Sequence, residues 1–288
     1  MFAEVNGVKL FFDIEGKEYV PDGPVLRRRP VCFVLHGGPG GDHTHFLPCV
    51  SALTDTMQLI YVDHRGCGRS GPAPVETYTM EQNADDVEAL RQYLGLGKVF
   101  VFGQSYGGMV AQAYALRYQE NLQGLILSSS APSHRIFDTL PIEMDKRAND
   151  EMKKELDTLW SNPNLTEEDC KRYMRTLNPL YHYHYDEKEC NDGVARSTWS
   201  PEVFRYGNEH ALATFDFVPD LPKIHVPTLV IGGEEDFITP PFHSREMAEA
   251  IPGAELVILP EAAHETYADQ PELMMGALRT FIMKYFEA

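Results

Sequence analysis

The sequence has few features that would favour insertion into a membrane or binding to nucleic acid. No apolar run in its 288 residues approaches the roughly 20 residues that span a bilayer. The first ten residues lack the positive flank and the apolar stretch of a signal peptide. The formal net charge is −18, whereas a phosphate-binding surface needs clustered Lys and Arg. We therefore expect a cytoplasmic protein that binds neither membranes nor nucleic acid.

Cysteine is also scarce, and basic residues rarely cluster. The five cysteines are odd in number and show no C-x-x-C spacing, which favours free thiols over a disulfide framework or a zinc site. The basic run at residues 27–29 is interpreted as a solvated turn between two strands. Two histidine clusters, at residues 42–45 and 182–184, lack the H-E-x-x-H arrangement. We expect no metal and no other cofactor.

Short apolar runs alternate with helical patterns along most of the chain. Continuous apolar runs of this kind are typical of strands that are buried on both faces of a sheet. The alternation predicts an α/β fold with a mostly parallel central sheet flanked by helices. The predicted strands lie at residues 31–35, 59–62, 99–102, 125–127, 228–231 and 256–259, after a hairpin at 5–14, and helices are expected at 80–94, up to 118, up to 250 and from 271.

The alternation stops between about residues 132 and 222. This segment is charged, aromatic and largely helical in pattern, and one helix is expected after Thr166, where acidic residues suit the positive end of the helix dipole. A chain of 288 residues is long enough for one large α/β domain with an insertion. We expect a core of residues 1–131 and 223–288 and a helical cap of residues 132–222.

A serine flanked by glycines follows the predicted strand at 99–102. The sequence G-Q-S-Y-G at residues 103–107 fits the G-x-S-x-G nucleophile elbow, in which the serine sits on a sharp strand-to-helix turn. A side chain at Gly103 or Gly107 would collide with a neighbouring strand or helix. Taken alone, the motif could also be an ordinary glycine-rich loop. Its best interpretation makes Ser105 the candidate nucleophile.

A serine hydroxyl becomes a good nucleophile when a histidine takes its proton and a carboxylate orients that histidine. Asp236 and His264 both follow predicted strands downstream of Ser105, and the order Ser, Asp, His is the one that α/β-hydrolases use. Asp236 is favoured because it lies farther along its loop. Rival residues are Glu234, Glu235, Asp216 and Asp220 for the acid, and His225 and His243 for the base.

The oxyanion formed during acyl transfer needs two donors that are already in place. One candidate is the backbone N–H of Tyr106, at the start of the helix that follows the elbow. The other is the backbone N–H of Gly38, in the glycine-rich loop at residues 36–41. This loop comes directly after a buried strand, as an oxyanion-binding loop should.

With these residues in place, the sequence resembles the proline iminopeptidase family of serine hydrolases, within the α/β-hydrolase superfamily. The resemblance rests on H-G-G-P-G at residues 36–40, D-H-R-G-C-G-R-S at 63–70, G-Q-S-Y-G-G at 103–108 and the two late loops, which carry Asp236 and His264. It implies an α/β-hydrolase fold and an enzyme that removes an N-terminal residue, often proline, from short peptides without a metal.

An enzyme of this kind must recognise a free α-ammonium group, for which carboxylates are the natural partners. The resemblance implies this role for Glu209, although a solvated helix glutamate is an equal alternative. Some family members have a second glutamate directly after the catalytic acid, where this chain has Phe237, and Glu235 or Glu265 could substitute for it. The residues expected to contact substrate are Gly37, Tyr206, Glu209 and Phe237.

The departure at Phe237 leaves other activities open. An amino-acid amidase, an esterase or a lactonase could use the same three residues, and a ligand-binding receptor could retain a hydrolase scaffold. Epoxide hydrolases and dehalogenases are disfavoured, because they have an aspartate where this chain has Ser105. The sequence carries no expectation of an oligomeric state.

Overall fold

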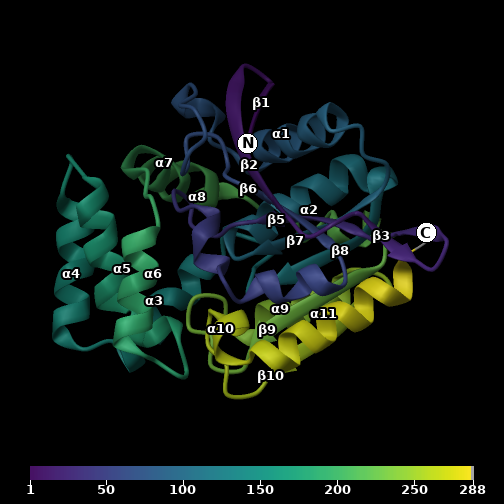
Figure 1. Ribbon diagram of the computed structural model, residues 1–288. Coiled ribbons are helices and arrows are strands. Elements are labelled where there is room, and N and C mark those ends of the chain that lie inside the picture. Colours follow the sequence, from purple (N-terminus) through teal and green to yellow (C-terminus); the bar gives the residue numbers. More distant parts are fainter. Residues whose placement is uncertain (287–288) are drawn as a thin grey trace.

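A computed structural model describes residues 1–286, in which an eight-stranded sheet has helices on both faces (Figure 1). The strand order is β1-β2-β6-β5-β7-β8-β9-β10. The pairs β1–β2 and β2–β6 are antiparallel, and the other pairs are parallel. The strands are β1 (Phe2–Val5), β2 (Val8–Glu15), β5 (Val31–Leu35), β6 (Gln58–Val62), β7 (Val99–Gln104), β8 (Leu122–Ser128), β9 (Thr228–Gly233) and β10 (Glu255–Leu259). The predicted α/β fold is confirmed.

A separate two-stranded hairpin lies outside this sheet. It consists of β3 (Tyr19–Asp22) and β4 (Val25–Arg28), which pair in antiparallel fashion. The expectation of a basic turn at residues 27–29 is therefore wrong, because Arg27 and Arg28 belong to a strand. Their guanidinium groups pair with acidic groups nearby: Arg27 with Asp22 at 3.4 Å, and Arg28 with Glu18 at 3.0 Å.

Three of the helices that cover the sheet begin where the sequence supplies a cap or a proline, at Thr79, Pro241 and Pro271. The Thr79 side chain accepts the Gln82 N–H at 3.2 Å, as predicted for the first long helix. None of the helices within residues 1–286 is long and apolar enough to cross a membrane. The covering helices are α1 (Met80–Tyr93), α2 (Tyr106–Tyr118), α9 (Pro241–Ala250), α10 (Thr266–Asp269) and α11 (Pro271–Tyr285).

Alternate side chains of each central strand reach opposite faces of the sheet. In β5, Phe33 and Leu35 join the apolar cluster that includes α1 and α2, whereas Cys32 and Val34 join the cluster that includes α11. Figure 1 shows α1 and α2 on one side of the sheet and α11 on the other. Because both faces are covered, the central strands are continuously apolar in sequence.

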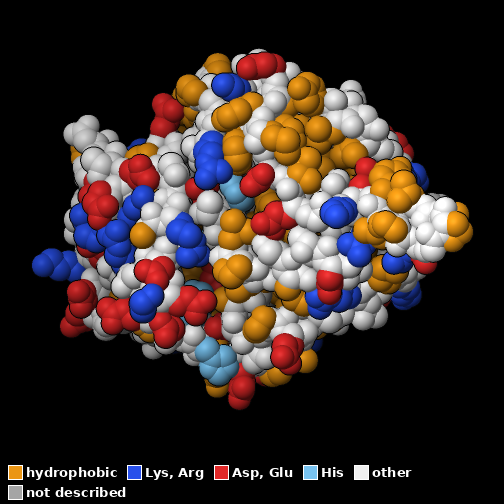
Figure 2. All heavy atoms as spheres, in the orientation of Figure 1, with side chains coloured by type: hydrophobic (Ala, Val, Ile, Leu, Met, Phe, Trp, Pro, Cys, Tyr) orange, Lys and Arg blue, Asp and Glu red, His pale blue; other side chains and the backbone are white. Residues whose placement is uncertain are grey.

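A run of helices interrupts the alternation between β8 and β9. Figure 1 shows most of it, in teal and green, to one side of the sheet. On the face shown in Figure 2, acidic and basic side chains are mixed over this part of the molecule. The inserted helices are α3 (Ile136–Arg147), α4 (Asp150–Ser161), α5 (Glu167–Tyr181), α6 (Glu187–Arg196), α7 (Pro201–Tyr206) and α8 (Leu212–Thr214). The helix predicted after Thr166 is confirmed as α5, with Thr166 and Asp169 forming a capping box.

The two ends of the inserted segment are joined by a short antiparallel bridge. The Phe217 N–H donates to the Pro132 carbonyl at 2.8 Å, and the His134 N–H donates to the Phe215 carbonyl at 2.8 Å. Beyond the bridge, β8 and β9 pair directly in the sheet, with Leu125 opposite Thr228. The insertion therefore leaves and rejoins the sheet at neighbouring positions.

Candidate active site

Ser105 occupies a strained turn between β7 and α2. Its backbone has φ 55° and ψ −121°, a region that residues with a side chain rarely adopt. The turn is held by the Ser105 N–H, which donates to the Ser128 carbonyl at 2.9 Å, and by the Ser130 hydroxyl, which donates to the Ser105 carbonyl at 2.9 Å. Strain of this kind persists where the surrounding structure fixes it, as at many functional sites.

The two glycines of the elbow allow backbones to approach each other closely. A Cβ atom on Gly107 would lie 2.1 Å from the Leu35 carbonyl oxygen, and one on Gly103 would lie 2.1 Å from the Gly107 carbonyl oxygen. The collisions expected from the sequence are therefore confirmed. Because glycine has no side chain at these two positions, α2 can start close to β5 and β7.

Gly107→Ala is expected to destabilise the fold by about 3 kcal/mol or more, because backbone atoms must move to admit the methyl group. Gly276→Ala is the matched control. Gly276 lies inside α11, and a Cβ atom there would meet nothing within 4 Å. That variant should gain about 0.5–1 kcal/mol from the lower backbone entropy of alanine. Urea unfolding of both variants gives the comparison, and equal midpoints would show that the close approach at Gly107 is not required.

The carboxylate and the imidazole predicted from the late loops are in direct contact. His264 Nδ1 lies 2.9 Å from Asp236 Oδ2 and 3.0 Å from Oδ1. The carboxylate also accepts the N–H groups of Ile238 and Thr239, both at 2.9 Å, and the Thr239 hydroxyl at 2.8 Å. Because an ionised carboxylate can only accept, Nδ1 carries a proton and Nε2 is the ring nitrogen free to act as a base.

Two opposing effects set the basicity of His264. Burial alone would lower the pKa of its ring, but the adjacent Asp236 carboxylate outweighs burial and holds that pKa above the ordinary value of 6.5. The Glu265 carboxylate acts in the same direction. The site therefore favours the imidazolium that forms when His264 accepts a proton.

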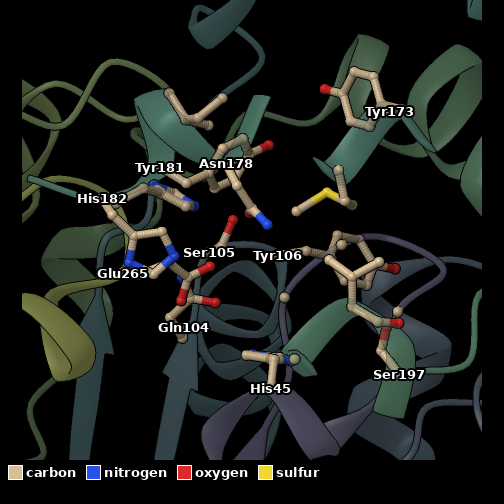
Figure 3. A pocket seen from close by; sticks show the side chains of 18 of the residues that line it. His45, Gln104, Ser105, Tyr106, Tyr173, Asn178, Tyr181, His182, Ser197 and Glu265 are labelled. Carbon is tan, nitrogen blue, oxygen red and sulfur yellow. The ribbon is translucent and has the colours of Figure 1, made fainter. Parts of the chain in front are cut away.

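Ser105 and His264 line the same cavity of about 280 Å³. Figure 3 shows Ser105 among Gln104 and Tyr106 from the core and Asn178 and Tyr181 from α5. Inserted helices and core loops both contribute to the lining. The structure thus brings the predicted nucleophile and base to one cavity, with the predicted acid directly behind the base.

The glycine-rich loop after β5 reaches Ser105. A Cβ atom on Gly37 would lie 3.2 Å from Ser105 Cβ. His36 Nδ1 donates to the Gly37 carbonyl at 2.7 Å, and His36 Nε2 accepts the His64 N–H at 3.1 Å. Burial, assisted by the proximity of His64, keeps the pKa of His36 well below its usual value. The neutral ring of His36 therefore holds this loop in place.

Gly38 and Tyr106 both line the cavity, as an oxyanion hole requires. Gly38 has φ 128°, which favours glycine. Tyr106 is the first residue of α2, where backbone N–H groups lack an acceptor within the helix. Their role as oxyanion donors stays a prediction.

Three residues that were expected to contact substrate do not line the cavity. The Glu209 side chain is 44% exposed and pairs with Arg205 at 3.0 Å. Tyr206 packs outside the cavity with Tyr78, and Phe237 is fully buried in an apolar cluster. The placement of these three residues in the substrate site is corrected, because each packs or pairs with other groups: Asn208, between Tyr206 and Glu209, lines the cavity, whereas the Phe237 ring is buried against inserted helices. Gly37, the fourth, does line the cavity.

The rival acids and bases lie elsewhere. Glu235 pairs with Arg147 at 3.2 Å, and Asp220 pairs with Lys223. Cys67 is buried, which raises the pKa of its thiol and disfavours a thiolate nucleophile. None of the rivals named from the sequence lines the cavity of Ser105; they are Glu234, Glu235, Asp216, Asp220, His225 and His243.

The first histidine cluster has other partners in the fold. His43 Nδ1 lies 2.6 Å from the Asp63 carboxylate, and His45 Nδ1 donates to the Asp42 carbonyl at 2.6 Å. Within the part of the chain that the structure describes, no group of three or more His, Cys, Asp or Glu side chains could hold a metal ion. These histidines order the loop that follows the glycine-rich segment.

The cavity also contains two polar residues, Gln104 and Asn178, that sequence reasoning left without a role, and Glu265, which it named only as a possible substitute for the second glutamate. Gln104 and Glu265 are next to Ser105 and His264 in the chain, so adjacency to the predicted nucleophile and base points to them. Asn178 comes from α5, and nothing in the helical pattern of that segment marks it as a cavity residue.

Comparisons with known proteins agree with this geometry. Residues 30–271 match the family model of the alpha/beta hydrolase fold. The chain is 30% identical over 269 residues to a proline iminopeptidase of Saccharolobus solfataricus, covering 86% of this chain and 83% of that protein. It is 29% identical to the proline iminopeptidase PfmaB of Pestalotiopsis fici, covering 98% and 99% of the two chains.

A solved structure extends the likeness to three dimensions. The proline iminopeptidase of Mycobacterium smegmatis superposes with a TM-score of 0.77 at 24% identity, over 99% of this chain and 98% of that one. At this identity the superposition bears on the fold alone. By the match over residues 30–271 and the identity to its relatives, the chain belongs to the alpha/beta hydrolase fold family and, within it, to the proline iminopeptidases.

Proposed function

We propose that the protein is a serine aminopeptidase that releases an N-terminal residue, proline or another small apolar one, from short peptides or amino-acid amides. The observation that carries this proposal is the His264–Asp236 pair, which meets Ser105 at one cavity. The relatives named proline iminopeptidases support the choice of substrate. We also propose a cytoplasmic setting, which the five free cysteines support.

The proposed reaction passes through an acyl-enzyme. Ser105 Oγ attacks the scissile carbonyl carbon while His264 Nε2 takes the hydroxyl proton. The carbonyl oxygen becomes an oxyanion, which the N–H groups of Gly38 and Tyr106 stabilise. When the carbon–nitrogen bond breaks, the imidazolium returns its proton to the leaving amine. Water then attacks the ester by the same route, with His264 as the base, and regenerates Ser105.

The chain is proposed to divide this work between two parts. The core, residues 1–131 and 223–288, carries Ser105, Asp236, His264 and the glycine-rich loop. The cap, residues 132–222, closes the cavity and selects the substrate. Support comes from the cavity lining: Ser105, His264 and the glycine-rich loop come from the core, whereas the cap contributes apolar and aromatic side chains together with polar ones such as Asn178 and Asp186.

Purified protein should hydrolyse prolyl and alanyl arylamides that have a free amine much faster than their N-acetylated counterparts. Blocking removes the positive charge that an aminopeptidase recognises and adds bulk next to the scissile carbonyl. Release of the arylamine, followed by absorbance, gives kcat/KM for each substrate. Equal rates on free and blocked amides would exclude an aminopeptidase. Hydrolysis of aryl esters with no cleavage of arylamides would identify an esterase with the same three residues.

A further inference from the structure

The glycine-rich loop after β5 is held by the inserted segment as well as by the core. Two backbone N–H groups of the cap donate to this loop: that of Ser200 to the Gly40 carbonyl at 2.8 Å, and that of Thr198 to Asp42 Oδ2 at 2.8 Å. Asp42 is buried, and its Oδ1 accepts the N–H and the hydroxyl of Thr44. The end of the loop is therefore fixed from both parts of the chain.

A glycine directly after α7 lets the cap approach the same loop closely. Gly207 has φ −59° and ψ −45°, ordinary helical values that any residue adopts, so its backbone does not require glycine. A Cβ atom there would lie 2.4 Å from Pro39 Cγ and 2.7 Å from Pro39 Cβ. Glycine in a helix costs about 0.5–1 kcal/mol relative to alanine. What this position requires is therefore the close packing against Pro39, the residue that follows Gly38.

The next residue of the loop is equally close to α7. Gly40 has φ 95°, and a Cβ atom there would lie 2.9 Å from the Ser200 carbonyl oxygen and 3.0 Å from Phe204 Cβ. Gly38 is thus followed in the chain by two residues, Pro39 and Gly40, whose positions are set by contacts with the cap.

The same segment of the cap also faces the substrate. Phe204 and Asn208 line the cavity of Ser105. Figure 3 shows Ser197, where this segment begins, to the same side of Ser105 as Tyr106, which is the other proposed oxyanion donor. A substrate in the cavity therefore contacts the element that holds the glycine-rich loop.

We propose that the cap segment at residues 197–208 positions the Gly38 N–H for catalysis, with Gly207 and Asp42 as positioning residues; this inference rests on the proposed acyl-enzyme function. An oxyanion donor must lie about 3 Å from the oxygen that becomes negative. A misplacement of about 1 Å can lower the rate about 100-fold. The requirement concerns α7 and its flanks, so the inserted helices α3 to α6 remain free to vary.

Two variants disturb this contact in different ways. Gly207→Ala should displace Pro39, and Asp42→Asn should lose the acceptor of the Thr198 N–H while keeping the size of the side chain. Each is expected to lower kcat for prolyl arylamide hydrolysis by about 10- to 100-fold and to leave KM within about twofold of the parent value, because the oxyanion forms after the substrate has bound. Gly276→Ala is the control and should change neither constant, since its added methyl group meets no atom of residues 1–286 within 4 Å.

A tetrahedral analogue distinguishes positioning of the loop from damage to the fold. In the boronic acid analogue of proline, Ser105 Oγ forms a bond to boron as its proton passes to His264, and a boronate oxygen occupies the place of the oxyanion. Prolinol, which has no carbonyl for Ser105 to attack, resembles only the bound substrate. In Gly207→Ala and Asp42→Asn, the inhibition constant of the boronic acid should rise by the same factor by which kcat/KM falls, whereas that of prolinol should stay within about twofold of the parent value.

The outcomes separate this inference from the proposed function. Parental kcat and parental affinity for the boronic acid in both variants would overturn it. Equal losses of affinity for the two inhibitors would overturn it as well, because the segment would then bind substrate rather than position the loop. Melting temperatures show which variants are folded, and Asp42→Asn decides alone if Gly207→Ala is not.

The proposed function is judged on the parent enzyme, by its preference for free over blocked arylamides. If the parent cleaves only aryl esters, the kcat comparison is made with an ester, because its carbonyl oxygen also becomes an oxyanion. The positioning role of the cap segment can therefore hold even if the enzyme is not an aminopeptidase.

Discussion

Ser105→Ala is expected to lower kcat for arylamide hydrolysis by about 10⁵- to 10⁶-fold, the loss seen when the nucleophile of a serine hydrolase is removed. The reason is that no second nucleophile can replace it. Burial raises the pKa values of the two thiols that line the cavity, Cys49 and Cys190, which disfavours a thiolate, and the Ser130 hydroxyl beside the elbow donates to the Ser105 carbonyl. Without Oγ, only binding and the oxyanion donors remain, and they do not form an acyl-enzyme.

The measurement is the burst of arylamine or phenol that precedes steady state, read with a substrate whose deacylation is slow. The burst should disappear in Ser105→Ala, while the melting temperature and the far-UV circular dichroism stay near those of the parent. This control is sound because alanine adds no atoms to the turn. A burst of normal amplitude would mean that the nucleophile is another residue.

Asp236→Asn is expected to lower kcat by about 10⁴-fold, the cost of losing the carboxylate that orients the catalytic histidine. The asparagine amide nitrogen can donate to Nδ1, which would favour the tautomer that places the proton on Nε2 and so block the base. The effect should be smaller than that of Ser105→Ala, because the nucleophile and the oxyanion donors are intact.

The pH profile gives Asp236→Asn a second signature. His264 acts as a base only when its ring is neutral, so kcat/KM falls as the pH decreases through the pKa of the free enzyme. In the parent enzyme Asp236 holds that pKa above 6.5, against the effect of burial. In the variant burial is no longer offset by Asp236, so the acidic limb of the profile should move to lower pH. A limb that stays in place would show that His264 is not the group that titrates.

The core of the fold could be predicted from the sequence because its local patterns agree with its tertiary structure. The run at residues 31–35 is apolar at every position and forms β5 over the same residues. The elbow was predictable for a similar reason: the glycines at 103 and 107 are required by contacts with backbone atoms, which leave a mark in the sequence. The late loops followed from the rule that active sites gather where parallel strands end.

The lining of the cavity could not be predicted in the same way. Glu209 and Glu265 are both glutamates near aromatic residues, and only the packing shows that one is exposed and paired with Arg205 while the other lines the cavity. Residue order fixes neither the direction in which a helix turns its side chains toward a distant loop nor the ion pairs that it forms. Cap residues such as Asn178 therefore became visible only in three dimensions.

The hydrogen bonds between Pro132 and Phe217 and between His134 and Phe215 also bear on how this enzyme can diversify. They hold the two ends of the inserted segment together. The connection between β8 and β9 is therefore closed at this point, whatever the length of the inserted segment. The entropy of closing a loop rises only slowly with its length, which makes large changes in that segment inexpensive. Under the proposed division of work, new specificities can thus arise by exchange of the inserted helices, while the core that carries Ser105, Asp236 and His264 stays unchanged.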